Sequence, residues 1–255
     1  MVPAGGPRVP WARDTEPARR RSIRTDSLTN RVLSDSPAGD RAAVLAESQM
    51  IVVPPGQTFA AAGELILSVF FPLSGVMYYV SEMTTGQQVS VAAVGSDGLV
   101  GAAALVGMAR YAYRVMALLE CEGYRVTVDS LRRTFQARDG FRSAALADIG
   151  RQWNEVASLL ACSRVHSHRE RVARWLLMTM DKSRQASLRL THEDLARMVG
   201  GARHAVTVVL NELRREGAIA HSRGRIEVVD RGLLLQHACE CHAAIEKAHR
   251  HNRIR

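Results

Sequence analysis

The feature that most constrains the fold is the stretch from residue 190 to residue 219, LTHEDLARMVGGARHAVTVVLNELRREGAI. Thr191 and Asp194 have the spacing of a capping box, which predicts the start of a short helix. The apolar residues of this helix fall on one face, which we expect to point inward: Leu195, Met198 and Val199. Gly200 and Gly201 end the helix, and a longer amphipathic helix follows. Two helices separated by so short a turn predict a helix-turn-helix.

The second helix of this pair has two faces of different chemistry. Its inner face carries apolar residues at the spacing i, i+3, i+4 and i+7: Val206, Val209, Leu210 and Leu213. The opposite face is small, polar and basic, and we expect it to contact DNA together with Thr191: Arg203, His204, Thr207, Val208, Asn211 and Arg215. In the major groove, arginine can pair with guanine, asparagine can pair with adenine, and valine or the threonine methyl can touch the thymine methyl.

A basic hairpin and an uneven distribution of charge support this interpretation. The segment IAHSRGRIEVVD (219–230) predicts a two-stranded wing whose Arg223 and Arg225 can bind phosphates. Residues 166–255 hold 17 Lys and Arg against 10 Asp and Glu, whereas residues 28–165 hold 11 against 12. A basic region of this kind favours nucleic acid as the partner. We therefore expect a domain over residues 166–255 that binds double-stranded DNA.

The sequence between residues 49 and 128 has a different pattern of apolar residues. Short apolar or alternating runs are separated by turn residues, as in MIVV before PPG and QVSVAAV before GSDG. This spacing predicts an antiparallel β-roll over residues 28–138, and not alternating βαβ units.

The N-terminal residues 1–27 contain six arginines, three acidic residues and four prolines, which predicts a disordered basic arm. This arm has no apolar signal core, and no run in the chain reaches the roughly 18 apolar residues that span a bilayer. We therefore expect a cytoplasmic protein with no membrane partner.

Residues 139–165 predict one long helix between these two regions. Five residues form a stripe with the spacing 3, 4, 3, 4, which is typical of a dimer interface: Leu146, Ile149, Trp153, Val156 and Leu160. The stripe fits a helix packed on its own domain as well as a dimerisation helix. We favour the dimer, because a symmetric interface at this place would hold two differently composed halves in register. A further helix is expected around residues 167–181, followed by the exit loop DKSRQAS (181–187). One face of this helix carries Val172, Trp175, Leu176 and Thr179.

The four cysteines do not suggest a disulfide framework in a chain without an export signal. The tail HACECH (237–242) brings four zinc-type ligands close together in sequence: His237, Cys239, Cys241 and His242. However, C-x-C is not the usual C-x-x-C clamp, and alternate residues of a helix point to different sides. We expect no metal site here and a terminal helix whose cysteines pack. A metal- or redox-responsive regulator that uses Cys162 or this cluster stays open as the alternative.

Catalytic motifs are missing from the sequence. There is no P-loop and no G-x-S-x-G, and His192-Glu193 lacks the second histidine of H-E-x-x-H. We therefore expect a binding protein and not an enzyme.

The order of β-roll, long helix and C-terminal winged helix-turn-helix resembles the Crp/Fnr family of bacterial transcription regulators. The resemblance covers roughly residues 28–245 and is carried by HSHRERVARWLLM, FFPLSGVMYYV, VGSDGLVGAAALVG and the helix-turn-helix. It implies an α+β fold with a cyclic-nucleotide-binding-like roll and a long dimerisation helix. It also implies a homodimer that binds a pseudo-palindromic operator and regulates transcription, with RNA polymerase as a further candidate partner.

Two departures from the family pattern matter for function. Members that read the cAMP-type operator open the recognition helix with Arg-Glu and place an arginine one turn later, whereas this chain has Arg203, His204 and Val208. We therefore expect a different operator. The cyclic nucleotide in this family rests on Gly-Glu followed about ten residues later by Arg and Ser or Thr, where the arginine pairs with the phosphate and the glutamate accepts from the ribose.

At the matching place this chain reads GAAALVGMARYA, and the candidate effector-binding residues are Gly101, Ala102, Arg110, Tyr111 and Arg114. Because Ala102 replaces the glutamate, we expect no ordinary cAMP binding, and no cofactor is predicted with certainty. A cyclic nucleotide whose phosphate is held by Arg110 or Arg114 stays open, as does the alternative that both are surface arginines. Residues 28–165 contain no histidine, which disfavours haem in the roll. The arm and the roll together supply only one cysteine, Cys121, which disfavours an iron–sulfur cluster.

Overall fold

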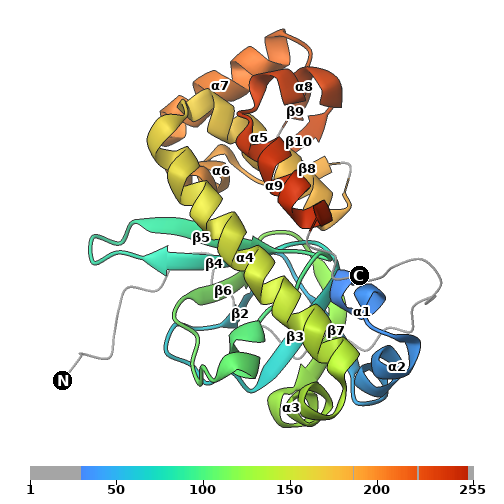
Figure 1. The fold of residues 1–255 in the computed structure, drawn as a ribbon. Helices are drawn as coiled ribbons and strands as arrows, with labels where there is room; N and C mark the ends of the chain where they lie inside the picture. The colour runs from blue at the N-terminus through green and yellow to red at the C-terminus, as the bar shows by residue number, and fades with distance from the viewer. Residues whose placement is uncertain (1–29, 186, 223, 252–255) are drawn as a thin grey trace.

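The computed structural model describes residues 30–185, 187–222 and 224–251. The basic arm expected at residues 1–27 lies outside the described residues. Figure 1 shows a β-rich N-terminal part, a helical C-terminal part, and one long helix, α4 (Asp139–Val165), which crosses the first part and continues beside the second. None of the described helices combines the length and the hydropathy needed to cross a membrane.

The N-terminal part is built from two antiparallel sheets, as the sequence predicts. The first has the strand order β1-β7-β3, with β1 at Gln49–Val53, β7 at Cys121–Thr127 and β3 at Ser68–Ser74. The second has the order β2-β6-β4-β5, with β2 at Thr58–Ala60, β6 at Arg114–Ala117, β4 at Met77–Glu82 and β5 at Gln88–Val94. Every strand pairing is antiparallel. Phe70, Phe71 and Met77 are fully buried in the core of this roll.

Short helices close the roll and attach it to α4. They are α1 (Arg31–Asp35), α2 (Ala38–Ala46), the 3-10 helix η1 (Ala102–Val106) and α3 (Val128–Ala137). The buried Asn30 caps α1 and donates through Nδ2 to the carbonyls of Pro72 and Gly98, at 3.0 and 2.8 Å. Asp148 of α4 accepts a hydrogen bond from the Leu99 N–H at 2.9 Å. The roll is therefore held to α4 by polar contacts as well as by its apolar core.

The C-terminal part is a winged helix-turn-helix. Its helices are α5 (His168–Ser183), α6 (His192–Val199), α7 (Arg203–Arg215), α8 (Arg231–His237) and α9 (Cys241–His251). Its small sheet has the order β8-β10-β9, with β8 at Ser187–Arg189, β9 at Ile219–Ser222 and β10 at Arg225–Val228. The predicted wing is the β9–β10 hairpin. The residues that periodicity predicts to face inward from α5 are buried: Val172, Trp175, Leu176 and Thr179.

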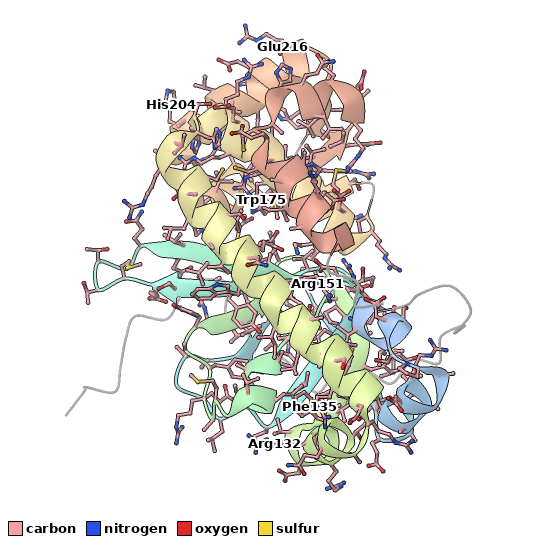
Figure 2. All side chains as sticks on the ribbon, viewed as in Figure 1. Arg132, Phe135, Arg151, Trp175, His204 and Glu216 are labelled. Carbon is pink, nitrogen blue, oxygen red and sulfur yellow. The ribbon has the colours of Figure 1, made fainter. Side chains whose placement is uncertain are left out.

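The two parts meet at a buried junction between the roll and α5. The Tyr78 hydroxyl lies 2.7 Å from the Thr179 hydroxyl, and the Tyr78 ring stacks on Trp175 with 5.9 Å between centroids; Figure 2 labels Trp175. Lys182 Nζ lies 2.6 Å from Asp97 of the roll and 3.0 Å from Glu155 of α4. The prediction that the exit loop begins before Lys182 is wrong. Helix α5 continues to Ser183 and buries Lys182 between two carboxylates.

Candidate nucleic-acid interface

The turn between α6 and α7 forms as the sequence predicts. The Thr191 hydroxyl oxygen accepts from the Asp194 N–H at 3.1 Å, and Asp194 accepts from the Thr191 N–H at 2.9 Å. These two bonds complete the capping box at the start of α6. Gly200 ends the helix with a φ of 75°, a left-handed conformation that favours glycine.

Helix α7 separates its apolar and polar residues as predicted. The four inner residues are buried: Val206, Val209, Leu210 and Leu213. On the outer face four side chains are exposed: Arg203, His204, Val208 and Arg215. Thr207 and Asn211 lie among them and are half-buried. Figure 2 labels His204 at the outer edge of the C-terminal part, away from the roll. The structure thus brings the six predicted α7 residues onto one accessible face.

Two histidines that the sequence analysis did not select support this face from behind. His192 Nδ1 lies 2.9 Å from the Thr207 hydroxyl, and His221 Nε2 lies 3.3 Å from Asn211 Oδ1. The two imidazole rings meet edge to face, with 5.4 Å between centroids. Burial, aided by nearby arginines, lowers the pKa of both rings. Nothing in the local pattern singles them out, because they come from α6 and β9 and meet only in the folded chain.

The charges around α7 are arranged so that the exposed face stays basic. Arg169 of α5 binds Glu212 of α7 at 3.2 Å and Glu216, at the C-terminal end of α7, at 2.6 Å, which neutralises these two carboxylates. Glu216 lies at the far end of the domain in Figure 2. In the wing, Arg225 is exposed, and its 3.8 Å contact with Glu227 is a weak surface pair. Arg223 lies outside the described residues.

The candidate effector residues of the roll do not form one site. Gly101, Ala102 and Tyr111 are buried and close together, and a methyl group at Gly101 would lie 2.8 Å from the Tyr111 hydroxyl. Arg110 is exposed and donates to the Gly63 carbonyl at 2.8 Å. Arg114 pairs with Val80 in the β4–β6 ladder, where burial lowers its pKa and Glu82 and Arg197 also act on it. It therefore lies toward α6 and not beside Gly101.

A tyrosine that the sequence analysis missed occupies the start of the expected phosphate cassette. The Tyr79 hydroxyl accepts a hydrogen bond from the Gly101 N–H at 3.0 Å. Burial raises the pKa of Tyr79 to about 12, so the hydroxyl is protonated near neutral pH. The Gly101 N–H, at the start of the expected cassette, is therefore bound within the protein.

The apolar stripe of α4 lies mainly on its solvent side. Leu146, Trp153 and Leu160 are exposed, and Trp153 as a whole residue is 73% accessible. Ile149 and Val156 are half-buried, and Ile149 packs against the core of the roll. The opposite side of α4 buries Phe141 and Asp148. The stripe is thus available to a partner along most of its length.

The cysteine-rich tail is arranged differently from its sequence order. His237 lies 2.8 Å from Glu216, and His242 lies 3.2 Å from Asp181, so both histidines bind elsewhere. The two cysteines instead join residues near the end of α4: Cys239 Sγ lies 3.5 Å from Cys162 Sγ, and Cys241 Sγ lies 3.6 Å from His166 Nδ1. Contrary to expectation, the two cysteines do not lie on two sides of one helix, because Cys239 precedes α9 and Cys241 is its first residue.

Comparison with known proteins agrees with this architecture. A Crp-like helix-turn-helix domain family matches residues 170–236, and a cyclic nucleotide-binding domain family matches residues 50–138. Transcriptional regulator LdrP of Thermus thermophilus is 27% identical over 188 residues, which are 71% of this chain and 93% of that protein.

Solved structures support the same fold. FixK2 from Bradyrhizobium japonicum aligns with a TM-score of 0.65 and 14% identity, over 75% of this chain and 98% of that one. A CRP-family regulator from Thermus thermophilus aligns with a TM-score of 0.63 and 23% identity, over 73% of this chain and 95% of that one. The chain thus combines a cyclic nucleotide-binding domain with a Crp-like helix-turn-helix domain, which is the domain composition and the fold of Crp/Fnr-type transcription regulators.

Proposed function

We propose that the protein acts as a homodimer in which each subunit places α7 in the major groove of one half of a pseudo-palindromic operator. The observation that carries this proposal is the outer face of α7, which combines exposed basic side chains with the apolar Val208. The nearby Glu212 and Glu216 are paired with Arg169. In helix-turn-helix proteins the second helix reads bases, and the residues at its N-terminal end contact base edges. RNA polymerase is the further partner of such a regulator at a promoter.

Three residues of this face, together with the wing and Thr191, have a specific role in the proposal. Arg203, in the first turn, reads a guanine or holds a phosphate. The Thr207 hydroxyl donates to the Arg203 carbonyl at 2.9 Å and lies beside His192, which leaves its methyl for a thymine contact. Val208 reads a neighbouring thymine methyl. Arg223 and Arg225 of the wing and the N-terminal turn at Thr191 bind the phosphate backbone.

The dimer rests on the exposed stripe of α4. A tryptophan that is 73% accessible is unusual on a monomer, and two such stripes packed together would bury Leu146, Trp153 and Leu160. Trp153→Asp should therefore give a monomer with a native circular-dichroism spectrum, because the exposed Trp153 contributes little to the core of one subunit. Sedimentation measures the mass, and Asn154→Asp, at an exposed neighbouring position, is the control. A Trp153→Asp protein that stays dimeric and binds its operator would remove the stripe from the proposal.

The sensory roll is proposed not to use cAMP in the ordinary way. Ala102 offers no carboxylate to a ribose, the Gly101 N–H already donates to Tyr79, and Arg110 is turned to the Gly63 carbonyl. A ligand phosphate would have to displace the tyrosine and recruit an arginine.

Selection of bound sequences from a random duplex library, at near-physiological salt and with or without cyclic nucleotides, tests the function. We expect a two-fold symmetric motif with fixed half-site spacing, unchanged by cAMP. Val208→Ala should relax one position of each half-site, whereas Val106→Ala, an exposed valine of the roll, should leave the motif unchanged. An unchanged half-site in Val208→Ala would contradict the proposed role of that residue, and an asymmetric motif would contradict the dimer.

A further inference from the structure

Four metal-ligand side chains converge where α4 ends and α9 begins. Cys162 lies in the last turn of α4, and His166 follows that helix. Cys239 lies two residues before α9, and Cys241 is the first residue of α9. One ligand atom from each of these residues lies within 4.8 Å of every other. The cluster joins positions that are 77 residues apart in the chain. No element of the proposed DNA-binding surface uses any of these residues.

The spacing suits a single tetrahedral ion. Zinc–sulfur bonds of about 2.3 Å in a tetrahedron place neighbouring ligand atoms about 3.8 Å apart. The Cys162–Cys239 sulfur distance is 3.5 Å, and the distance from Cys241 Sγ to His166 Nδ1 is 3.6 Å. Three thiols and one imidazole form a donor set that favours zinc among the biological metals. An iron–sulfur cluster distributes its ligands over several iron atoms and would need a wider set.

His166 is oriented as a metal ligand would be. Its Nδ1 faces Cys241, and its Nε2 lies 3.0 and 3.1 Å from the two carboxylate oxygens of Glu240. A proton on Nε2 then bonds to Glu240, and the lone pair of Nδ1 faces the sulfur atoms. This is the carboxylate–histidine–metal relation that fixes the tautomer of ligating histidines.

The ligand side chains are largely enclosed by the protein. Cys162 and Cys239 are buried, and Cys241 and His166 are half-buried. Four protein ligands leave no open position for a substrate, which is the arrangement of structural zinc sites.

We propose that Cys162, His166, Cys239 and Cys241 bind one structural Zn²⁺ that fastens α9 to the junction between α4 and α5. The ion would fix the position of α9 relative to the end of α4, where the long helix meets the DNA-binding domain. Because such a site exists only in the folded chain, its binding free energy adds to stability. The rival chemistry of the same residues is a Cys162–Cys239 disulfide, which requires the sulfur atoms to close to about 2.05 Å.

The test uses the full chain purified without a histidine tag, under reducing conditions and without chelator. Mass spectrometry of the metal content should find about one zinc per chain. Protein stripped of metal and loaded with Co²⁺ should show the thiolate–cobalt absorption of a tetrahedral site. Cys239→Ser/Cys241→Ser should lose both signals, whereas His237→Gln, in the same tail but bound to Glu216, should keep them.

A second variant avoids the risk that cysteine substitutions disturb folding. Glu240 is exposed, so Glu240→Gln should keep its circular-dichroism spectrum and bind zinc about 10- to 100-fold more weakly. The proposal is overturned if reduced, folded protein contains no zinc and takes up no Co²⁺. It is also overturned if Cys239→Ser/Cys241→Ser retains the metal, or if the cysteines are recovered from cells as a disulfide without metal.

Discussion

Replacing Lys182 with methionine should destabilise the protein strongly, because it removes the ammonium that faces two carboxylates at the centre of the molecule. Lys182 Nζ lies 2.6 Å from Asp97 and 3.0 Å from Glu155. The side chains of Lys182 and Glu155 are only 7% and 6% exposed, whereas that of Asp97 is 26% exposed. Water can therefore solvate Asp97 in the variant far better than Glu155.

The size of the effect follows from this difference in burial. Removing one partner of a buried ion pair typically costs about 3–5 kcal/mol. Because Asp97 is partly solvated and Arg174 also acts on Glu155, we expect the lower end, about 3 kcal/mol. For a chain of this size that corresponds to a fall in Tm of about 6–12 °C.

The destabilisation should also depend on pH. Burial raises the pKa of Glu155, and Lys182 opposes this rise. Without Lys182 the folded-state pKa moves further above the unfolded value, which is about 4.3. A carboxyl group shifted in this direction loses stability as the pH rises through its folded pKa. The deficit of Lys182→Met should therefore be larger at about pH 8 than at about pH 5.

Thermal and urea unfolding followed by circular dichroism measure this deficit. Glu155→Gln/Lys182→Met should recover much of the lost stability, because the buried carboxylate is gone. Lys247→Met, at the chain's other and exposed lysine, should change stability by less than about 0.5 kcal/mol. A deficit in Lys182→Met that is below about 1 kcal/mol, or that is equal at both pH values, would refute the reasoning.

Three further changes test other parts of the fold, each by urea unfolding. Tyr78→Phe should cost about 1–2 kcal/mol, because the buried Thr179 hydroxyl loses its 2.7 Å partner, and Tyr78→Phe/Thr179→Val should restore most of that loss. Thr191→Ala should cost about 1 kcal/mol by removing the cap of α6, whereas Thr191→Ser should be nearly neutral. Gly200→Ala should destabilise the protein by about 1 kcal/mol because of its φ of 75°. Gly39→Ala, in open space at the start of α2, should stabilise it slightly. A change in unfolding free energy of the same sign for both variants would contradict the backbone argument.

The helix-turn-helix could be predicted from the sequence because its determinants are local. Thr191 and Asp194 are three residues apart, and the apolar residues of α7 repeat within one helix. The antiparallel roll could be predicted for a similar reason, since turn residues divide its sequence into short strands. Ala102 in the expected phosphate cassette was visible too, but the Tyr79 hydroxyl at the Gly101 N–H was not, because it comes from another strand.

What could not be predicted depends on contacts between distant segments. Tyr78 and Thr179 are 101 residues apart, and Lys182 and Asp97 are 85 apart. A lysine in the polar sequence DKSRQAS is normally exposed, and only the two carboxylates that converge on Lys182 make its burial favourable. The grouping of the cysteines with His166 could not be predicted for the same reason. The histidines nearest to Cys239 and Cys241 in sequence bind elsewhere, and His166 comes from the end of α4.

These long-range contacts give α5 a particular place in the molecule. Near its C-terminal end, Thr179 and Lys182 bind the roll. Just before its N-terminal end, His166 belongs to the proposed zinc site. Arg169 in its first turn binds Glu212 of α7 and Glu216, the residue that follows α7. A helix held at both ends transmits a displacement as a rigid body. A change in the roll that moved the β4–β5 strands would therefore act on α5, and through it on the direction of α7. Such a change would regulate DNA binding only if it favoured one of two arrangements of this junction, since a ligand that binds both equally shifts neither.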